Sequence, residues 1–292
     1  MKRPSRSAQL AGLILCGVVL AACGSAASPS ASGGAASATI NVAASASSSA
    51  NSLASPTPNA STASWASPKA NATVKTYKVK LSATATGSVA RIEFFVTSSG
   101  KSKAACVARK PDTAGNWTCT ADLLKLGVVP GMVSFSFDAT DASSAVRTAP
   151  DGTRSVTYAV PPPAPTDGTY KEWKTTQTGE FLWMVDYRAT WTAPDGYATR
   201  FRVYGLTRCL RYSAANNGQP CVVSGSTIPS GAVKLIATLD GTRRSTTISW
   251  ERSDGLWIDP YAGYLVRASN QYGSSTYTIL WSAIVCSGTC AY

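Results

Sequence analysis

The chain carries few residues that could perform acid–base or nucleophilic chemistry. Its 292 residues include no histidine, so the usual general base of serine and cysteine hydrolases is missing. The run Ser98–Lys101 has the spacing S-x-x-K, but it follows a strand pattern instead of opening a helix, and no Lys-Thr-Gly lies downstream. Glu172, Glu180 and Glu251 stand in no recognisable hydrolase context. The sequence therefore predicts that the protein is not an enzyme and has no catalytic residues.

Aromatic side chains that could bind a ligand are concentrated in the second half of the chain. The loop segment SDGLWIDPYAG, residues 253–263, places Trp257 and Tyr261 between two strand patterns. Loops carry the binding residues of many scaffolds, and Trp, Tyr and Arg dominate binding hot spots. We therefore predict a ligand contact at Trp257 and Tyr261, with Arg243, Arg244 and Arg252 as polar partners. The alternative is that both rings pack over a sheet edge.

The cysteines predict disulfides and no metal site. Cys16 lies in the N-terminal apolar run, and six cysteines follow beyond residue 100: Cys106, Cys119, Cys209, Cys221, Cys286 and Cys290. An even number in an exported chain favours disulfides. Their order predicts three local pairs, with a cross-pairing of Cys209 or Cys221 with the tail as the alternative. Because the chain lacks histidine and C-x-x-C spacing, we expect no metal and no cofactor.

The N-terminus predicts export. Lys2, Arg3 and Arg6 precede an uncharged apolar run, Leu10–Ala22, which is shorter than the roughly 20 residues that span a bilayer. The sequence Leu-Ala-Ala-Cys at residues 20–23 resembles the lipobox of bacterial lipoproteins. The resemblance implies a signal peptide over residues 1–22 and lipidation of Cys23, which anchors the mature chain at the cell membrane, facing the exterior or the periplasm. The alternatives are an ordinary secreted protein and an uncleaved membrane helix.

A low-complexity stalk should follow, over residues 23–69. No charged residue occurs from Gly24 to Pro68, and Ala, Ser, Thr, Gly and Pro dominate. Such a segment cannot bury enough apolar surface to offset its ordering entropy, so we expect it to be disordered. The formal net charge is +12, and +9 after loss of the three cations of the signal. Outside the cell, anionic envelope polymers, glycans or proteins are more plausible partners than nucleic acid.

Two all-β units are predicted beyond the stalk. Tyr77–Ala83, Arg91–Val96 and Val133–Ala139 alternate apolar and polar residues, as half-buried strands do, and indicate a β-sandwich over residues 70–160. A proline-rich run over residues 161–165 cannot join a central ladder and predicts a linker. Alternation resumes after it, for example in Thr199–Tyr204, and predicts a second sandwich over residues 166–292.

Each unit resembles a known family of sandwich domains. The segments VKLSATATGSVARIEFFV, GNWTCTADL and VSFSFDATDASS resemble bacterial immunoglobulin-like domains. In the second unit, YRATWTAPDG, ATRFRVYG and GYLVRASNQYGSS resemble the B, C and F strands of fibronectin type III domains. That second resemblance implies that Trp191 packs in the core and that Tyr264 forms a tyrosine corner, its hydroxyl bonding to the backbone.

The sequence therefore indicates a lipid-anchored cell-envelope protein that acts in non-catalytic binding or adhesion at the cell surface. Neither family implies chemistry, because such sandwiches serve as spacers, adhesion modules and scaffolds for binding loops. Two alternatives remain open from the sequence. One is a structural spacer or assembly partner, and the other is a carbohydrate-binding accessory of a polymer-degrading system.

Overall fold

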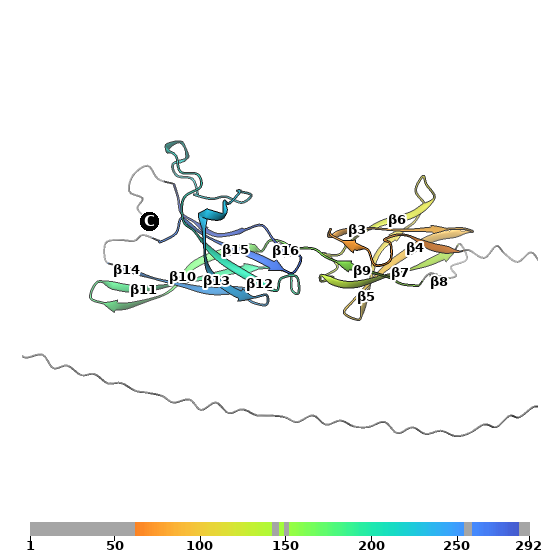
Figure 1. The fold of residues 1–292 in the computed structure, drawn as a ribbon, viewed down its shortest axis with the longest axis horizontal. Helices are drawn as coiled ribbons and strands as arrows, with labels where there is room; N and C mark the ends of the chain where they lie inside the picture. The colour runs from red at the N-terminus through yellow and green to blue at the C-terminus, as the bar shows by residue number, and fades with distance from the viewer. Residues whose placement is uncertain (1–61, 142–145, 149–151, 254–258, 286–292) are drawn as a thin grey trace, which may run out of the picture. The chain divides into compact units, whose positions relative to one another are not determined.

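Two β-sandwiches make up nearly all of the structure (Figure 1), a computed structural model that describes residues 62–141, 146–148, 152–253 and 259–285. The only helices among these residues are two 3-10 turns, η1 at Ala214–Asn216 and η2 at Ser230–Ala232. None of them has the length and hydropathy needed to cross a bilayer. The all-β prediction is confirmed. The predicted signal, most of the stalk and Cys23 lie outside the described residues, as do Trp257, Cys286 and Cys290.

The first sandwich packs a three-stranded sheet against a six-stranded sheet. The smaller sheet has the order β1-β3-β6, from Ala63–Ser67, Lys78–Ala85 and Asn116–Asp122. The larger sheet has the order β2-β9-β7-β4-β5, and β8 pairs with β7. Its strands are β2 Thr73–Val74, β4 Val89–Ser98, β5 Lys101–Ala108, β7 Gly131–Asp141, β8 Val146–Thr148 and β9 Arg154–Tyr158.

The core of the first sandwich follows from the two-residue alternation of its strands. Phe94 on β4 and Phe137 on β7 are directly paired and fully buried. Trp65 on β1 covers both rings, with centroid distances of 5.7 Å to Phe94 and 4.9 Å to Phe137. The predicted start of this domain at residue 70 is therefore too late, because β1 begins at Ala63. Its composition matches the Ala/Ser-rich segment before it, and only the buried Trp65 distinguishes it from a stalk.

The second sandwich packs a three-stranded sheet, β10-β11-β14, against a five-stranded one, β13-β12-β15-β16 with β17 beside β15. The three-stranded sheet is formed by β10 Thr166–Gly179, β11 Leu182–Thr192 and β14 Ser245–Ser253. The five-stranded sheet is formed by β12 Arg200–Leu206, β13 Val233–Asp240, β15 Gly263–Asn270, β16 Gly273–Ser274 and β17 Thr278–Ser282. Trp191 is 3% exposed in the core between them, as predicted.

One tyrosine joins the two sandwiches, which both belong to the compact unit Pro56–Tyr292. Tyr197 lies between β11 and β12 of the second sandwich, but its ring is buried in the core of the first. Its hydroxyl donates to the Val128 carbonyl at 2.7 Å. Asn270, at the end of β15, donates from Nδ2 to the carbonyls of both Val160 and Tyr197, each at 3.0 Å. In addition to the proline-rich linker, the two sandwiches are therefore connected by the buried hydrogen bond of Tyr197.

Two of the three predicted disulfides lie in the described residues and are confirmed. Cys106 on β5 and Cys119 on β6 are joined, with Cα atoms 6.0 Å apart, so this bridge ties together the edges of the two opposed sheets of the first sandwich. Cys209 and Cys221 are joined in the connection between β12 and β13. That bridge closes the loop that carries η1 and supports the wall of a groove described below.

We predict that Tyr197→Phe destabilises the first sandwich. The ring keeps its packing, but the buried Val128 carbonyl loses its donor, which should cost about 1–3 kcal/mol. Calorimetry should show a lower Tm for the first sandwich. The matched control is Tyr212→Phe, because Tyr212 is 72% exposed and loses no buried hydrogen bond. Equal melting of the two variants would show that the hydroxyl contributes nothing.

A second prediction concerns the bridge between the sheets. Replacing Cys106 and Cys119 together by Ala opens a loop with a sequence separation of 13 residues. The chain-entropy treatment gives a loss of about 3 kcal/mol for a loop of this size. Calorimetry of the double variant should lower the Tm of the first sandwich and leave the Cys209–Cys221 bridge intact in non-reducing peptide maps. An unchanged Tm would contradict the expected constraint.

Candidate binding site

Of the two predicted aromatic residues, only Tyr261 lies in the described part of the chain, and it packs into the second sandwich. A Cβ atom added to Gly205 on β12 would lie 2.3 Å from the Tyr261 ring, so the ring rests directly on that glycine. Tyr261 also meets Tyr264 edge-on, with a centroid distance of 5.6 Å. The arrangement is that of the alternative interpretation, in which the ring packs against a sheet.

Of the three predicted arginines, Arg243 and Arg244 are neighbours in the turn before β14, and Arg252 lies apart from them. Arg244 forms an ion pair with Asp195 at 2.7 Å and donates to the carbonyls of Ala193 and Gly241, so its guanidinium is used by the fold. Arg243 precedes β14 at its first end, whereas Arg252 lies near the other end, opposite Trp183 on β11. Eight strand residues span about 27 Å, so these two side chains do not form one site.

An aromatic stack crosses the core of the second sandwich where the sequence showed only separate residues. Tyr187 on β11 lies between Tyr170 on β10 and Trp250 on β14, with centroid distances of 4.5 and 5.6 Å and nearly parallel planes. Tyr170 stacks in turn on Tyr264 of the opposite sheet at 4.4 Å. Trp250 is half-buried and donates from Nε1 to the Tyr170 hydroxyl. Trp250 is thus one end of the stack.

Tyr264 ends this stack with a partner that differs from the prediction. Its hydroxyl donates to Asp259 Oδ1 at 2.8 Å, where a tyrosine corner was expected to bond to the backbone. The same carboxylate oxygen accepts the backbone N–H of Tyr261 at 2.9 Å. Asp259 lies in the connection between β14 and β15, so its side chain replaces the backbone acceptor. Burial raises the pKa of Asp259 and outweighs these two hydrogen bonds, which lower it.

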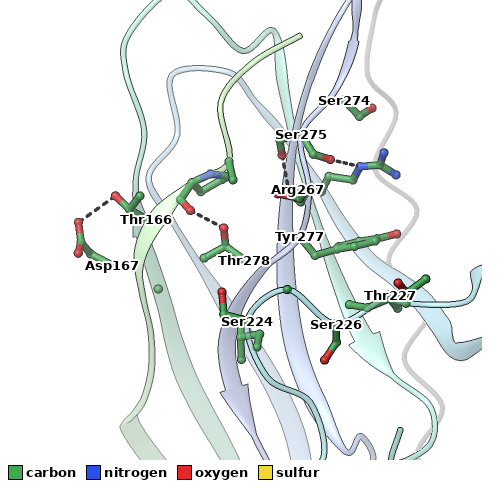
Figure 2. A pocket seen from close by; sticks show the side chains of 17 residues that line it. Thr166, Asp167, Ser224, Ser226, Thr227, Arg267, Ser274, Ser275, Tyr277 and Thr278 are labelled. Carbon is green, nitrogen blue, oxygen red and sulfur yellow. Dashed lines mark hydrogen bonds between the residues drawn. The ribbon is translucent and has the colours of Figure 1, made fainter. Parts of the chain in front are cut away.

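An open groove of about 920 Å³ lies on the second sandwich. Three segments far apart in the sequence form it: residues 164–168 at the start of β10, residues 224–228 after the Cys209–Cys221 bridge, and residues 274–279 across β16 and β17. Figure 2 shows that hydroxyl groups make up most of its polar lining. Sequence reasoning missed it, because no motif marks hydroxyls that meet only through the fold.

Close approach of two backbones positions one wall of the groove. A Cβ atom on Gly168 of β10 would lie 2.5 Å from the Ile279 carbonyl oxygen of β17, so a residue larger than glycine would push the strands apart. The Thr278 hydroxyl donates to the Pro165 carbonyl across the same junction. These contacts hold the start of β10 against β17 and so fix one wall of the groove.

A cation over an aromatic ring forms the polar end of the groove. Arg267 on β15 donates from Nε to the Ser275 carbonyl at 2.7 Å, and its guanidinium lies 5.2 Å from the centre of the Tyr277 ring. The only carboxylate of the lining, Asp167, accepts a hydrogen bond from the Thr166 hydroxyl. Such a surface offers hydrogen bonds and one positive charge, and its lining contains no paired carboxylates and no metal-binding cluster. Its chemistry suits binding.

Comparison with known proteins gives one family match, over the first sandwich, and several distantly similar structures. Residues 62–171 match the family of bacterial Ig domains. The solved structures similar to the chain include fibronectin(III)-like modules of CbhA from Clostridium thermocellum, at 15% identity, with 77% of this chain and 94% of that one covered and a TM-score of 0.26. A tetra-tandem repeat of a large adhesion protein matches at 15% identity over 75% of this chain and 48% of the other, with a TM-score of 0.28.

A marsupial T cell receptor matches at 9% identity over 77% of this chain and 73% of that one, with a TM-score of 0.30. Comparison with curated proteins gave no match. Residues 62–171 thus match a family of sandwich domains that commonly bind without catalysis or act as spacers, and the second unit is likewise a β-sandwich. The bacterial Ig domain and the two disulfides indicate a location outside the cytoplasm.

We predict that Asp259→Asn removes a pH dependence from the stability of the second sandwich. Because the folded-state pKa of Asp259 is raised, the folded state holds its proton longer, and stability falls as pH rises through the window above the ordinary aspartate pKa. Asn keeps an acceptor for Tyr264 without the charge. Denaturation between about pH 4 and pH 8 should show wild type losing stability relative to the variant. The same change of stability with pH in wild type and variant would contradict the assignment.

Proposed function

We propose that this chain is a lipid-anchored cell-envelope protein whose two β-sandwiches bind, without catalysis, a polymer or protein outside the cell. The charged N-terminus, the short apolar run and Cys23 support export and lipid anchoring. The two disulfides fit an oxidising compartment. The stalk expected over residues 23–69 would then separate the anchor from the sandwiches.

The open groove beside Arg267 and Tyr277 carries the binding half of the proposal. A surface lined with serine and threonine hydroxyls can exchange hydrogen bonds with a polar chain, because each hydroxyl both donates and accepts. The groove is partly open to solvent, which suits a polymer or peptide better than a small enclosed ligand. Its placement on connections and strand ends is the usual one for binding residues of a sandwich scaffold.

A spacer function is the second candidate, and the Tyr197 contact favours it. A buried hydrogen bond across the junction of two sandwiches limits their relative rotation. A spacer benefits from that stiffness, while a groove-binding protein does not require it. The two functions predict different results when the groove is filled.

The anchor is tested by Cys23→Ala. Loss of the acylated thiol should move the protein from the membrane fraction to the soluble or secreted fraction, because lipid is the only anchor in this proposal. Fractionation followed by immunoblotting measures the shift, and wild type is the control. Tight membrane retention of the variant would exclude lipid as the sole anchor.

The binding half is tested by filling the groove. Ser224 is exposed in the groove wall, so Ser224→Trp should occupy the groove without disturbing the core. We expect binding of the purified protein to its own envelope fraction to fall at least about tenfold, the loss of one binding anchor. Thr207→Trp is the matched control, since Thr207 is exposed on the same sandwich outside the groove. Equal binding by both variants would favour the spacer.

A further inference from the structure

A second surface of the same sandwich presents an exposed tryptophan held by an arginine. Trp173 on β10 is 63% exposed, although large aromatic rings usually bury most of their area. The guanidinium of Arg188, on the neighbouring strand β11, lies 5.5 Å from the centre of the Trp173 ring. This cation–π contact orients the indole without covering it.

A shallow cavity of about 350 Å³ lies against this pair. Its other lining residues are Leu239, Arg243, Ser245, Thr246 and Thr247, from the end of β13, the following turn and the start of β14. It thus combines an indole, two guanidinium groups and three hydroxyls, and its lining contains no carboxylate. The groove beside Tyr277 shares none of these residues.

The two arginines of this cavity differ from Arg244 next to them. The guanidinium of Arg244 pairs with Asp195 and donates to backbone carbonyls. Over the described residues, neither Arg188 nor Arg243 forms an ion pair. Asp240, three residues before Arg243, interacts electrostatically with that arginine, and its carboxylate accepts hydrogen bonds from Thr242. Two charged donors therefore face solvent beside a flat ring.

The geometry points to a binding site for an acidic polysaccharide at Trp173, Arg188 and Arg243. A sugar ring presents a flat C–H face to the exposed indole, and stacking on a rigid aromatic gives contact area at small entropic cost. An anionic group of the sugar meets the two guanidinium groups, whose forked donors match a carboxylate. Ser245 and Thr247 supply hydrogen bonds to the sugar hydroxyls. The site stands on its own lining residues and does not depend on the groove.

Two oligosaccharide probes test this site on the full chain: galacturonic acid oligomers, which are acidic, and galactose oligomers of equal length, which are neutral. Titration calorimetry should show that wild type prefers the acidic oligomer at least about tenfold. Trp173→Ala should weaken binding of the acidic oligomer by about tenfold or more. Arg243→Gln should abolish the preference and leave residual stacking. Raising salt from about 50 to 500 mM should weaken the acidic complex in wild type.

Tyr212→Ala is the matched control, because Tyr212 is an exposed aromatic of the same sandwich outside this cavity. Calorimetric melting confirms that each variant is folded, and Arg243→Gln remains informative if Trp173→Ala is not. Equal affinity for both oligomers would overturn the proposal, as would tighter binding of single-stranded DNA of equal charge. No binding of either galacturonic acid or hyaluronan oligomers would also overturn it, whatever the groove variant Ser224→Trp does.

Discussion

The hydroxyl of Tyr197 connects the two sandwiches through a buried backbone carbonyl of the other domain. Each sandwich has its own core of alternating strand residues. Tyr197 lies between two strands of the second sandwich, but its ring is buried in the core of the first. Its hydrogen bond to Val128 is shielded from water, so breaking it would leave a buried acceptor unpaired. Asn270 adds two bonds on the side of the linker. These contacts make the junction more than a proline-rich tether.

Within the second sandwich, the aromatic stack stabilises the fold, while the candidate binding surfaces lie elsewhere, at strand ends and on a sheet face. Tyr170, Tyr187, Trp250 and Tyr264 stack through the interior and join the two sheets. The residues with free polar surface lie at the margins instead, along the hydroxyl-lined groove and beside Trp173. The stacked rings have most of their faces covered by one another, while a ring on a sheet face keeps one side for a ligand.

The two candidate surfaces differ in the kind of recognition they support. The groove beside Tyr277 is open and its polar lining consists mostly of hydroxyl groups, and its Arg267 already donates to a backbone carbonyl. The cavity beside Trp173 is smaller and carries two arginines without a carboxylate partner in its lining. The hydroxyl-lined groove can form hydrogen bonds with many polar ligands. The two arginines of the cavity beside Trp173 add selectivity for negatively charged ones. A surface protein with both could hold a polar polymer and discriminate by charge.

Much of the architecture could be predicted from the sequence, because strand alternation and local cysteine spacing are short-range signals. The alternation in Arg91–Val96 and Val133–Ala139 identified strands that form β4 and β7. The order of the cysteines predicted the pairs Cys106–Cys119 and Cys209–Cys221, and the structure decided the second against a cross-pairing with the tail. The buried Trp191 followed from resemblance to a fibronectin type III strand. The start at Ala63 did not, because β1 has the composition of a stalk and is a strand only because Trp65 covers Phe94 and Phe137.

What only the tertiary structure decided is which polar and aromatic residues meet. The sequence grouped Tyr261 with Arg243, Arg244 and Arg252 because they are close along the chain. In the structure β14 separates Arg252 from the other two arginines, and the Tyr261 ring packs on Gly205. Trp173 and Arg243 are 70 residues apart and line one cavity. Sheet packing brings strands together without regard to their distance in sequence, so local composition determined the fold class, while strand order and register determined the surfaces that can bind.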